Sequence, residues 1–444
     1  MPRSFNQAGD EAVPVCQRCS KAQRYCDRTV PAPQFRSKSQ EDAAKPDSTA
    51  AASSSPFPAP TSPRKALQNP SIARYFRHYI VHIAPWYDLS DASSTFSTGL
   101  PEASLGRALP LSAILALSAV HMSRTSAPSA RAAAEFYHGH CVRLLIDLTA
   151  EEDYGGEDAQ GLALASVCLL RSYEILSEEV DPNRHLWGAY SLAVHRNTLS
   201  DCLGSGIGAA GFWNYLREDI TFSLFRQCPL KIDLEQMPLP TRHDTDQDHL
   251  NTVSLILGRI INACFSGAVT EGAWSSLFRM LQDWRSGLPP RFAPFARTER
   301  GLGLALPSIW MLRDCHAAAL HYRLVSMSLL CTHATPERLS DLRALLDDED
   351  GARADITEHD FAESLALDVC GVAFTTDAPA VQVNSFGPIA FCARFFSAEP
   401  ARHELIRRLL ACRRTIGWPV QRLIADLEAE WGVSTVRATR GDDE

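Results

Sequence analysis

The feature that most constrains the fold is a helical spacing of apolar residues that starts near residue 71 and continues almost to residue 432. Ile72, Phe76, Ile80 and Ile83 form one helical face, which we expect Pro85 to end. Alternation with a period of two is nearly absent, and Val381-Gln382-Val383 is too short to predict a strand. The sequence therefore predicts an all-α body in which the helices bury their faces against one another. The expected helices cover 110–123, 130–149, 158–179, 185–202, 211–228, 248–268, 272–286, 307–333, 335–347, 360–374, 387–397, 401–416 and 417–432.

The stretch before this body has a different composition. Residues 31–70 hold eight Pro, seven Ser and eight Ala, together 23 of 40. Such a stretch buries too little surface to offset the entropy lost on ordering. We therefore expect an N-terminal segment at 1–40, a disordered Pro/Ser/Ala linker at 41–70, and a large irregular helical domain at 71–444.

Charge is distributed unevenly between the start of the chain and the rest. Residues 1–70 carry ten Lys/Arg and six Asp/Glu, a balance of +4, whereas the other 374 residues carry 33 and 46, a balance of −13. A basic start on an acidic body indicates that the start meets polyanions. No apolar run reaches the ~18 residues of a membrane helix, and the start lacks a secretory signal, so we expect a soluble intracellular protein without a membrane partner.

The thirteen cysteines fall into two kinds. Ten are scattered through apolar segments, as expected for buried thiols in a reducing compartment. Cys16, Cys19 and Cys26 instead form a C-x2-C-x6-C pattern, whose close spacing lets the thiolates bind one tetrahedral zinc. Neighbouring cations favour the thiolate form and can contact phosphates. The candidate DNA-binding residues are Arg18, Lys21, Arg24 and Arg28.

This candidate zinc site is incomplete. A structural zinc ion takes four protein ligands, and the segment supplies three. The next histidine, His78, lies beyond the linker. The alternative interpretation is a disordered basic tail with incidental thiols.

The N-terminal pattern, followed by Phe35-Arg36 and a Pro/Ser linker, resembles the fungal zinc binuclear-cluster transcription factors. Those proteins hold two zinc ions with six cysteines in two halves, and Cys16 to Arg28 resembles the second half. Several body motifs are similar to the family's fungal-specific regulatory domain, in the same order along the chain. They are Phe76 to Trp86, Leu111 to Val120, Leu170 to Glu174, Trp187 to Tyr190, Phe212 to Ile220, Cys228 to Leu230, Trp284 to Pro289, Phe386 to Pro388 and Trp418 to Trp431.

The resemblance implies a nuclear protein that binds zinc and DNA and acts on the transcription machinery. It also implies dimerisation, which here would use the helical domain. The first cysteine half, which carries the helix that reads the major groove, has no counterpart in residues 1–15. Either the chain is truncated at its start or it has lost the reading half. Phosphate contacts alone predict weak DNA binding without sequence preference. The alternative is a helical interaction or effector-sensing regulator that does not bind DNA.

Two further motifs could carry chemistry. Gly206-Ile-Gly208-Ala-Ala-Gly211 satisfies G-x-G-x-x-G, but the expected element before it is a helix rather than the strand that a nucleotide site needs. The run His243 to His249 is rich in acids and imidazoles, and we interpret it as a solvated connection after Pro238 and Pro240. No catalytic motif is found, so we expect no enzyme.

The aromatic segment Phe212 to Ile220 completes the set of candidates. Its apolar residues at helical spacing, with Trp213 among them, predict core packing rather than a ligand cage. Arg217, which precedes two acids, is expected to form a surface or half-buried ion pair.

Overall fold

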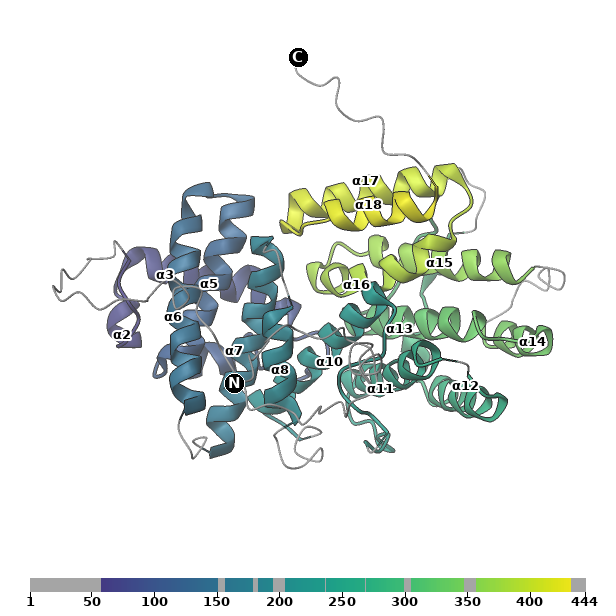
Figure 1. The fold of residues 1–444 in the computed structure, drawn as a ribbon, viewed down its shortest axis with the longest axis horizontal. Coiled ribbons are helices and arrows are strands. Elements are labelled where there is room, and N and C mark those ends of the chain that lie inside the picture. Colours follow the sequence, from purple (N-terminus) through teal and green to yellow (C-terminus); the bar gives the residue numbers. More distant parts are fainter. Residues whose placement is uncertain are drawn as a thin grey trace, which may run out of the picture.

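The computed structural model describes residues 57–150, 156–178, 183–194, 204–235, 237–267, 269–298, 305–346 and 357–432. Helices make up most of these residues, which confirms the predicted all-α class (Figure 1). Within these ranges, no helix is both long enough and apolar enough to span a membrane.

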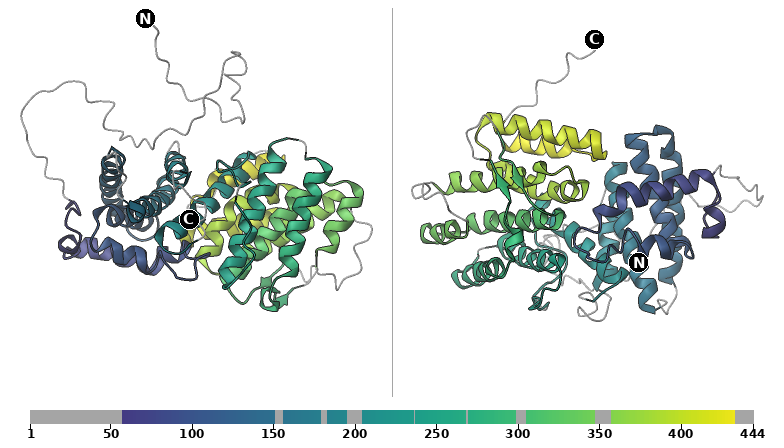
Figure 2. Two further views of the ribbon diagram at one scale, coloured as in Figure 1. Left: turned by 90° about the horizontal axis from the view of Figure 1, so that it is seen from below. Right: turned by 180° about the vertical axis from the view of Figure 1, so that it is seen from behind.

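Two groups of helices lie side by side, as the three views show (Figures 1 and 2). We call α2 to α8 the N-terminal half and α11 to α18 the C-terminal half. The N-terminal half contains α2 (Pro63–Ala66), α3 (Pro70–His78), η2 (Tyr79–Ile83), η3 (Ala84–Trp86), α4 (Gly99–Ser104), α5 (Ala108–Thr125), η4 (Pro128–Ala130), α6 (Arg131–Ala150), α7 (Gly156–Ser177) and α8 (Arg184–Val194). Helix α10 (Ile207–Arg226) packs against α7 and α8 on one side and against α16 and α11 on the other, so it joins the halves.

The C-terminal half is a stack of helices with one small strand pair. Its elements are α11 (Asp246–Phe265), α12 (Glu271–Ser286), η5 (Pro290–Phe292), β1 (Ala296–Arg297), β2 (Ile309–Trp310), α13 (Asp314–Cys331), α14 (Pro336–Ala344), α15 (Glu358–Thr375), α16 (Pro379–Cys392), η6 (Ala393–Phe395), α17 (Glu399–Ile416) and α18 (Gln421–Glu430). Figure 1 shows α17 and α18 in yellow as a pair above α15 and α16, reaching toward the N-terminal half.

Burial along each helix follows its apolar pattern. Helix α5 is buried without a break from Pro110 to Met122, as expected for a helix that is apolar on all sides. Helix α12 buries only one stripe, Trp274, Leu277, Leu281 and Trp284, at the i, i+3, i+7 spacing of an amphipathic helix on the surface. The core is therefore centred on α5 and its neighbours, with amphipathic helices at the edge.

The first expected helical face changes helix type instead of ending abruptly. Asn69 caps α3 by accepting from the backbone N–H of Ser71 at 2.9 Å, and Pro70 occupies the first turn, where its missing N–H costs nothing. The chain then passes through the π-helical turn η2 and the 3₁₀ turn η3, which contains Pro85. Pro85 thus lies in the last turn of this path rather than just after it.

Three expected boundaries are wrong. The ordered region begins before residue 71: residues 57–70 include α2, and the ring of Phe57 packs on that of Phe136 with centroids 5.8 Å apart. The helix expected at 387–397 begins earlier, at Pro379, as α16. Val381 and Val383, which alternate like strand residues, are both buried in this helix. The helix expected at 307–333 begins only at Asp314, because Ile309 and Trp310 form strand β2. Strand β2 pairs antiparallel with β1.

Candidate functional site

The residues that the sequence offers for zinc and DNA lie outside the described part of the chain. This applies to Cys16, Cys19 and Cys26 and to the surrounding basic residues Arg18, Lys21, Arg24 and Arg28. The zinc ligands and phosphate contacts therefore stay predictions. Residues 41–56, the first part of the expected linker, also lie outside the described ranges.

The scattered cysteines are free thiols of the helix core, as expected. Nine of the ten lie in the described residues, and eight of these nine are buried. Burial raises their pKa, for example that of Cys264 to about 12 and that of Cys412 to about 11. Such thiols stay protonated and unreactive at neutral pH.

Within the glycine motif, Gly211 serves helix packing and Gly206 serves a turn with positive φ. Gly206 precedes α10 with a φ of 96°, and a Cβ on Gly211 would lie 3.2 Å from Cγ of Leu164 in α7. Gly206 also lines a cavity of about 360 Å³, whose charged lining consists of three aspartates and one arginine. An acidic lining repels a pyrophosphate, so the described site does not suit a nucleotide. Its charged residues are Asp91, Arg242, Asp244 and Asp248.

The interpretation of residues 243–249 as a solvated connection is wrong for residues 246–249, which form the first turn of α11, whereas residues 243–245 precede the helix. Thr245 is the N-cap, and Asp248 accepts from the backbone N–H of Thr245 at 2.8 Å, completing a capping box. His249 is buried, and its ring stacks on that of His243 with centroids 4.2 Å apart. Burial also lowers the pKa of His249 to about 4.

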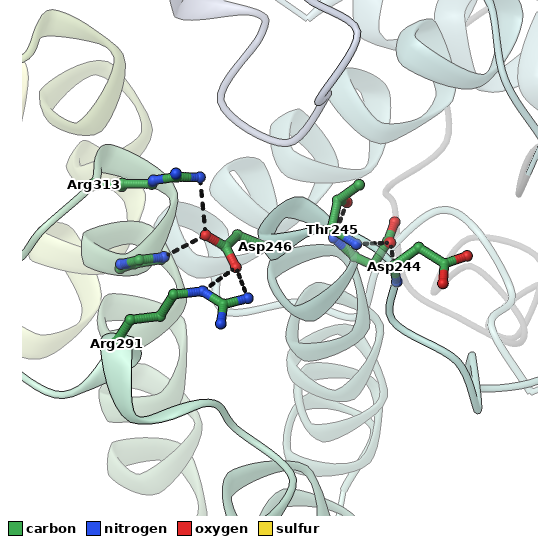
Figure 3. Close-up of polar contacts among 7 residues, drawn as sticks. Asp244, Thr245, Asp246, Arg291 and Arg313 are labelled. Atoms are coloured by element: carbon green, nitrogen blue, oxygen red, sulfur yellow. Dashed lines mark hydrogen bonds and ion pairs between the residues drawn. The ribbon is translucent and has the colours of Figure 1, made fainter.

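Asp246 is the centre of a buried charge cluster that sequence reasoning missed (Figure 3). Its Oδ1 accepts from Nε of Arg291 at 2.8 Å, and its Oδ2 accepts from Nη1 of Arg313 at 3.1 Å. Nε2 of His316 lies 2.9 Å from the same Oδ2. The carboxylate is 3% exposed, whereas the two arginine side chains are 50% and 65% exposed. The cluster therefore holds three segments together: the start of α11, the η5 turn and the start of α13.

The electrostatics of this cluster keep Asp246 ionised. Burial by itself would raise the pKa of Asp246, but the hydrogen bonds from Arg291 and His316 and their charges lower it to about 2. Ligand atoms of Asp246, Cys315 and His316 lie within 4.8 Å of one another. However, burial raises the pKa of Cys315 to about 11, and two guanidinium groups already occupy the carboxylate. A metal ion would have to displace both cations, so we interpret the cluster as a structural tie.

Arg217 forms a second buried polar junction, rather than the surface or half-buried ion pair that the sequence suggested. The residue is 3% exposed, and its Nη2 donates to Oδ1 of Asn214 at 2.6 Å. Its Nε donates to Oδ1 of Asn384 at 3.2 Å, across to α16. Glu218, next in the chain, pairs instead with Arg171 of α7 at 3.6 Å. Through buried side chains, Arg217 therefore links α10 to α16 of the C-terminal half, and Glu218 links it to α7 of the N-terminal half.

The aromatic residues of α10 behave as the sequence predicts. Phe212 is fully buried and Trp213 is 7% exposed, with their rings edge to face and centroids 5.3 Å apart. This geometry is typical of packed aromatic pairs. The core assignment is therefore confirmed.

Part of the described chain, from α3 to the first turn of α10, is similar to a known domain. Residues 74–209 match the fungal specific transcription factor domain. The match covers less than a third of the chain and includes the polar residues Arg171 and Glu174 of α7. No curated protein and no solved structure is significantly similar to the chain. The matched family consists of transcription factor domains rather than enzymes, which implies a role in transcription regulation.

Proposed function

We propose that this chain is a nuclear transcription regulator of the fungal zinc-cluster type, in which residues 1–40 contact DNA and the helical body controls that contact. The observation that supports it most is the match of residues 74–209 to a regulatory domain, with the C-x2-C-x6-C segment on the same chain. The first supplies the regulatory class, and the second supplies a chemistry that can hold metal and meet phosphates.

In this proposal, the thiolates of Cys16, Cys19 and Cys26 supply three of the four ligands of one zinc ion. The surrounding cations bind phosphate oxygens, which contribute affinity without reading the base sequence. Four phosphate contacts predict that log K falls with log[salt] with a slope of about −3.6. The cations are Arg18, Lys21, Arg24 and Arg28. Dimerisation through the helical body and contact with the transcription machinery complete the proposed partners.

The test measures zinc content and DNA binding on the full chain. Native mass spectrometry should find one zinc per chain, and replacing Cys16, Cys19 and Cys26 by Ser should remove it. Fluorescence anisotropy with a duplex oligonucleotide should give weak binding with a steep salt dependence. Neutralising the four N-terminal cations to Gln should abolish this binding.

A matched control neutralises four exposed arginines of the body instead. Arg279, Arg407, Arg414 and Arg422 are exposed on α12, α17 and α18 and, like the N-terminal four, change the net charge by four when replaced by Gln. This control should leave DNA binding within about twofold of the unchanged chain, since distant exposed charges are screened. Equal losses in both variants would show that binding reflects net charge alone.

The second candidate is a regulator that does not bind DNA and acts through its helical body. The three-cysteine count favours it, because a structural zinc site takes four ligands. A chain that binds neither zinc nor duplex DNA in the experiment above supports this candidate and contradicts the first.

A further inference from the structure

The ends of α5, α7 and α17 meet at a cavity of about 530 Å³ that no sequence motif predicted. Ser123 and Arg124 come from the last turn of α5, and Arg131 begins α6. Glu178 follows α7, and Arg413 lies in the last turn of α17. The cavity therefore lies where the N-terminal half meets the end of the C-terminal half.

Close packing between the halves builds one wall of this cavity. Gly417 ends α17 with a φ of 73°, and a Cβ there would lie 3.0 Å from Cγ2 of Thr125 in α5. The carbonyl of Gly417 accepts a hydrogen bond from Nε of Arg124. A positive φ and a close neighbour together require glycine at this position. The end of α17 is thus held firmly against α5.

The charged lining of the cavity consists of three arginines and one glutamate, which leaves two positive charges. Arg124 forms an ion pair with this glutamate, since its Nη2 lies 3.3 Å from Oε1 of Glu178. Its Nη1 donates to the carbonyl of Leu176 at 3.0 Å. Arg124 is therefore a structural residue, which leaves Arg131, whose charge Glu135 partly offsets, and Arg413 as the other cations of the lining.

Arg131 and Arg413 keep donors that could reach a ligand. Arg131 donates from Nε to Glu135 at 3.0 Å and from Nη2 to the carbonyl of Ser177 at 3.2 Å. Arg413 donates from Nε to the side-chain oxygen of Gln421 at 3.0 Å, an uncharged partner. Among the described residues, Arg413 pairs with no carboxylate, and Nη1 of Arg131 and Nη2 of Arg413 have no hydrogen-bond partner.

We propose that this cavity binds a small phosphorylated molecule, with Arg131 and Arg413 on the phosphate. Guanidinium groups match phosphate oxygens in charge and in geometry. A volume of about 530 Å³ falls in the range of small-molecule sites and leaves room for an organic group beside the phosphate. Arg131 belongs to the matched domain and Arg413 to α17, so a bound phosphate bridges the two halves. This site does not depend on the proposed contact between residues 1–40 and DNA.

The experiment titrates the full chain with glycerol 3-phosphate and ribose 5-phosphate at constant ionic strength, by calorimetry and by thermal melting. Glycerol and ribose are the uncharged counterparts. Both phosphates should bind and raise the melting midpoint by about 2 °C at ten times Kd, because the ligand stabilises only the folded state. The uncharged compounds should do neither. Failure of both phosphates to bind overturns the proposal.

Two neighbouring arginines give a matched pair of variants. Arg413→Gln should weaken phosphate binding at least tenfold, because it removes one charge-assisted contact. Arg414→Gln removes the same charge from an exposed residue that does not line the cavity. This variant should bind the phosphates as tightly as the unchanged chain does. Equal weakening in both would mean that the phosphates respond to general charge, which contradicts a built site. Arg131→Gln is the second lining variant, with the same expected loss, should Arg413→Gln disturb folding.

Discussion

Asp246 shows how one buried carboxylate can fix three chain segments. It receives hydrogen bonds from Arg291, Arg313 and His316, which lie 45, 67 and 70 positions away in the sequence. Its pKa of about 2, against an ordinary 3.8, means that folding favours the ionised form. The resulting stabilisation of about 2 kcal/mol is fully present above pH 4 and is lost as the pH falls toward 2.

Asp246→Asn should therefore lower the free energy of unfolding by about 2 kcal/mol at pH 7, as measured by urea denaturation. Asp244→Asn is the control, because Asp244 is exposed and its partner Arg242 is 83% exposed. That change should cost less than about 0.5 kcal/mol. The difference between the two variants should shrink as the pH is lowered below 4. A difference that stays constant down to pH 2 would contradict the ionic role of Asp246.

Trp213 tests the core assignment of α10. Trp213→Ala should destabilise the chain by about 3 kcal/mol, because it leaves a cavity beside Phe212. Trp310→Ala removes the same side chain from a position that is 47% exposed, and it should cost less than about 1 kcal/mol. Thermal melting of both variants makes the comparison. Equal melting points would place Trp213 on the surface.

The sequence could predict which single residues are buried but not which polar residues meet. Trp213 and Phe212 are apolar at helical spacing, so their burial follows from local pattern alone. The partners of Asp246 depend on how α11, η5 and α13 pack, which no local spacing encodes. Local spacing likewise suggests Glu218 and Asp219 as partners of Arg217, whereas its hydrogen-bond partners lie on α10, on α16 and in the segment before α4.

Helices α10 and α16 approach so closely that glycine is needed between them. A Cβ on Gly387 would lie 2.8 Å from Cα of Thr221 in α10, and a backbone atom cannot move aside cheaply. Gly387→Ala should therefore destabilise the chain by about 2 kcal/mol through overpacking. The measurement is the midpoint of urea denaturation.

Gly272→Ala provides the opposite outcome on another helix. Gly272 lies in α12, and nothing is within 4 Å of a Cβ placed there. Alanine should stabilise the chain by about 0.5 kcal/mol, because it favours helix and restricts the unfolded chain. If both substitutions stabilise, the close contact between α10 and α16 is not present in solution.

At the level of elements, local pattern predicted long helices well and their junctions poorly. The expected 110–123 and 272–286 lie within α5 and α12, because a continuous apolar face specifies each one. Helix α16 was missed over its first turns because Val381 and Val383 alternate like a strand, although both are buried within a helix. Strand β2 was hidden inside an expected helix, because only its pairing with β1 defines it.

At the scale of the whole molecule, a chain of two histidines links α3, α5 and α17. Nε2 of His121 lies 3.0 Å from the carbonyl oxygen of Ile416, which can only accept, so this nitrogen carries the proton. Nδ1 of His121 then accepts from Nε2 of His78 at 2.8 Å. Burial lowers the pKa of both rings to about 4. The link therefore needs His121 neutral, because a protonated Nδ1 could not accept the hydrogen bond from His78.

The free energy of unfolding should fall as the pH decreases from 6.5 to 4, because the unfolded histidines take up protons that the folded ones refuse. His121 contributes up to about 3 kcal/mol of this loss. In His121→Asn the dependence on pH over this range should be shallower. His403→Asn, at a side chain that is 72% exposed, should leave it unchanged. Urea denaturation at several pH values measures the slopes, and parallel slopes in all three proteins would contradict the role of His121.

The contact between His121 and Ile416 joins residues that are 295 positions apart. During synthesis, at ~5–20 residues per second, α5 leaves the ribosome about 15–60 s before the segment that covers its end. Over that interval the nascent chain presents apolar surface that its own later residues will cover. Chaperone binding to ribosome-bound chains should therefore be strongest between the emergence of α5 and that of α17.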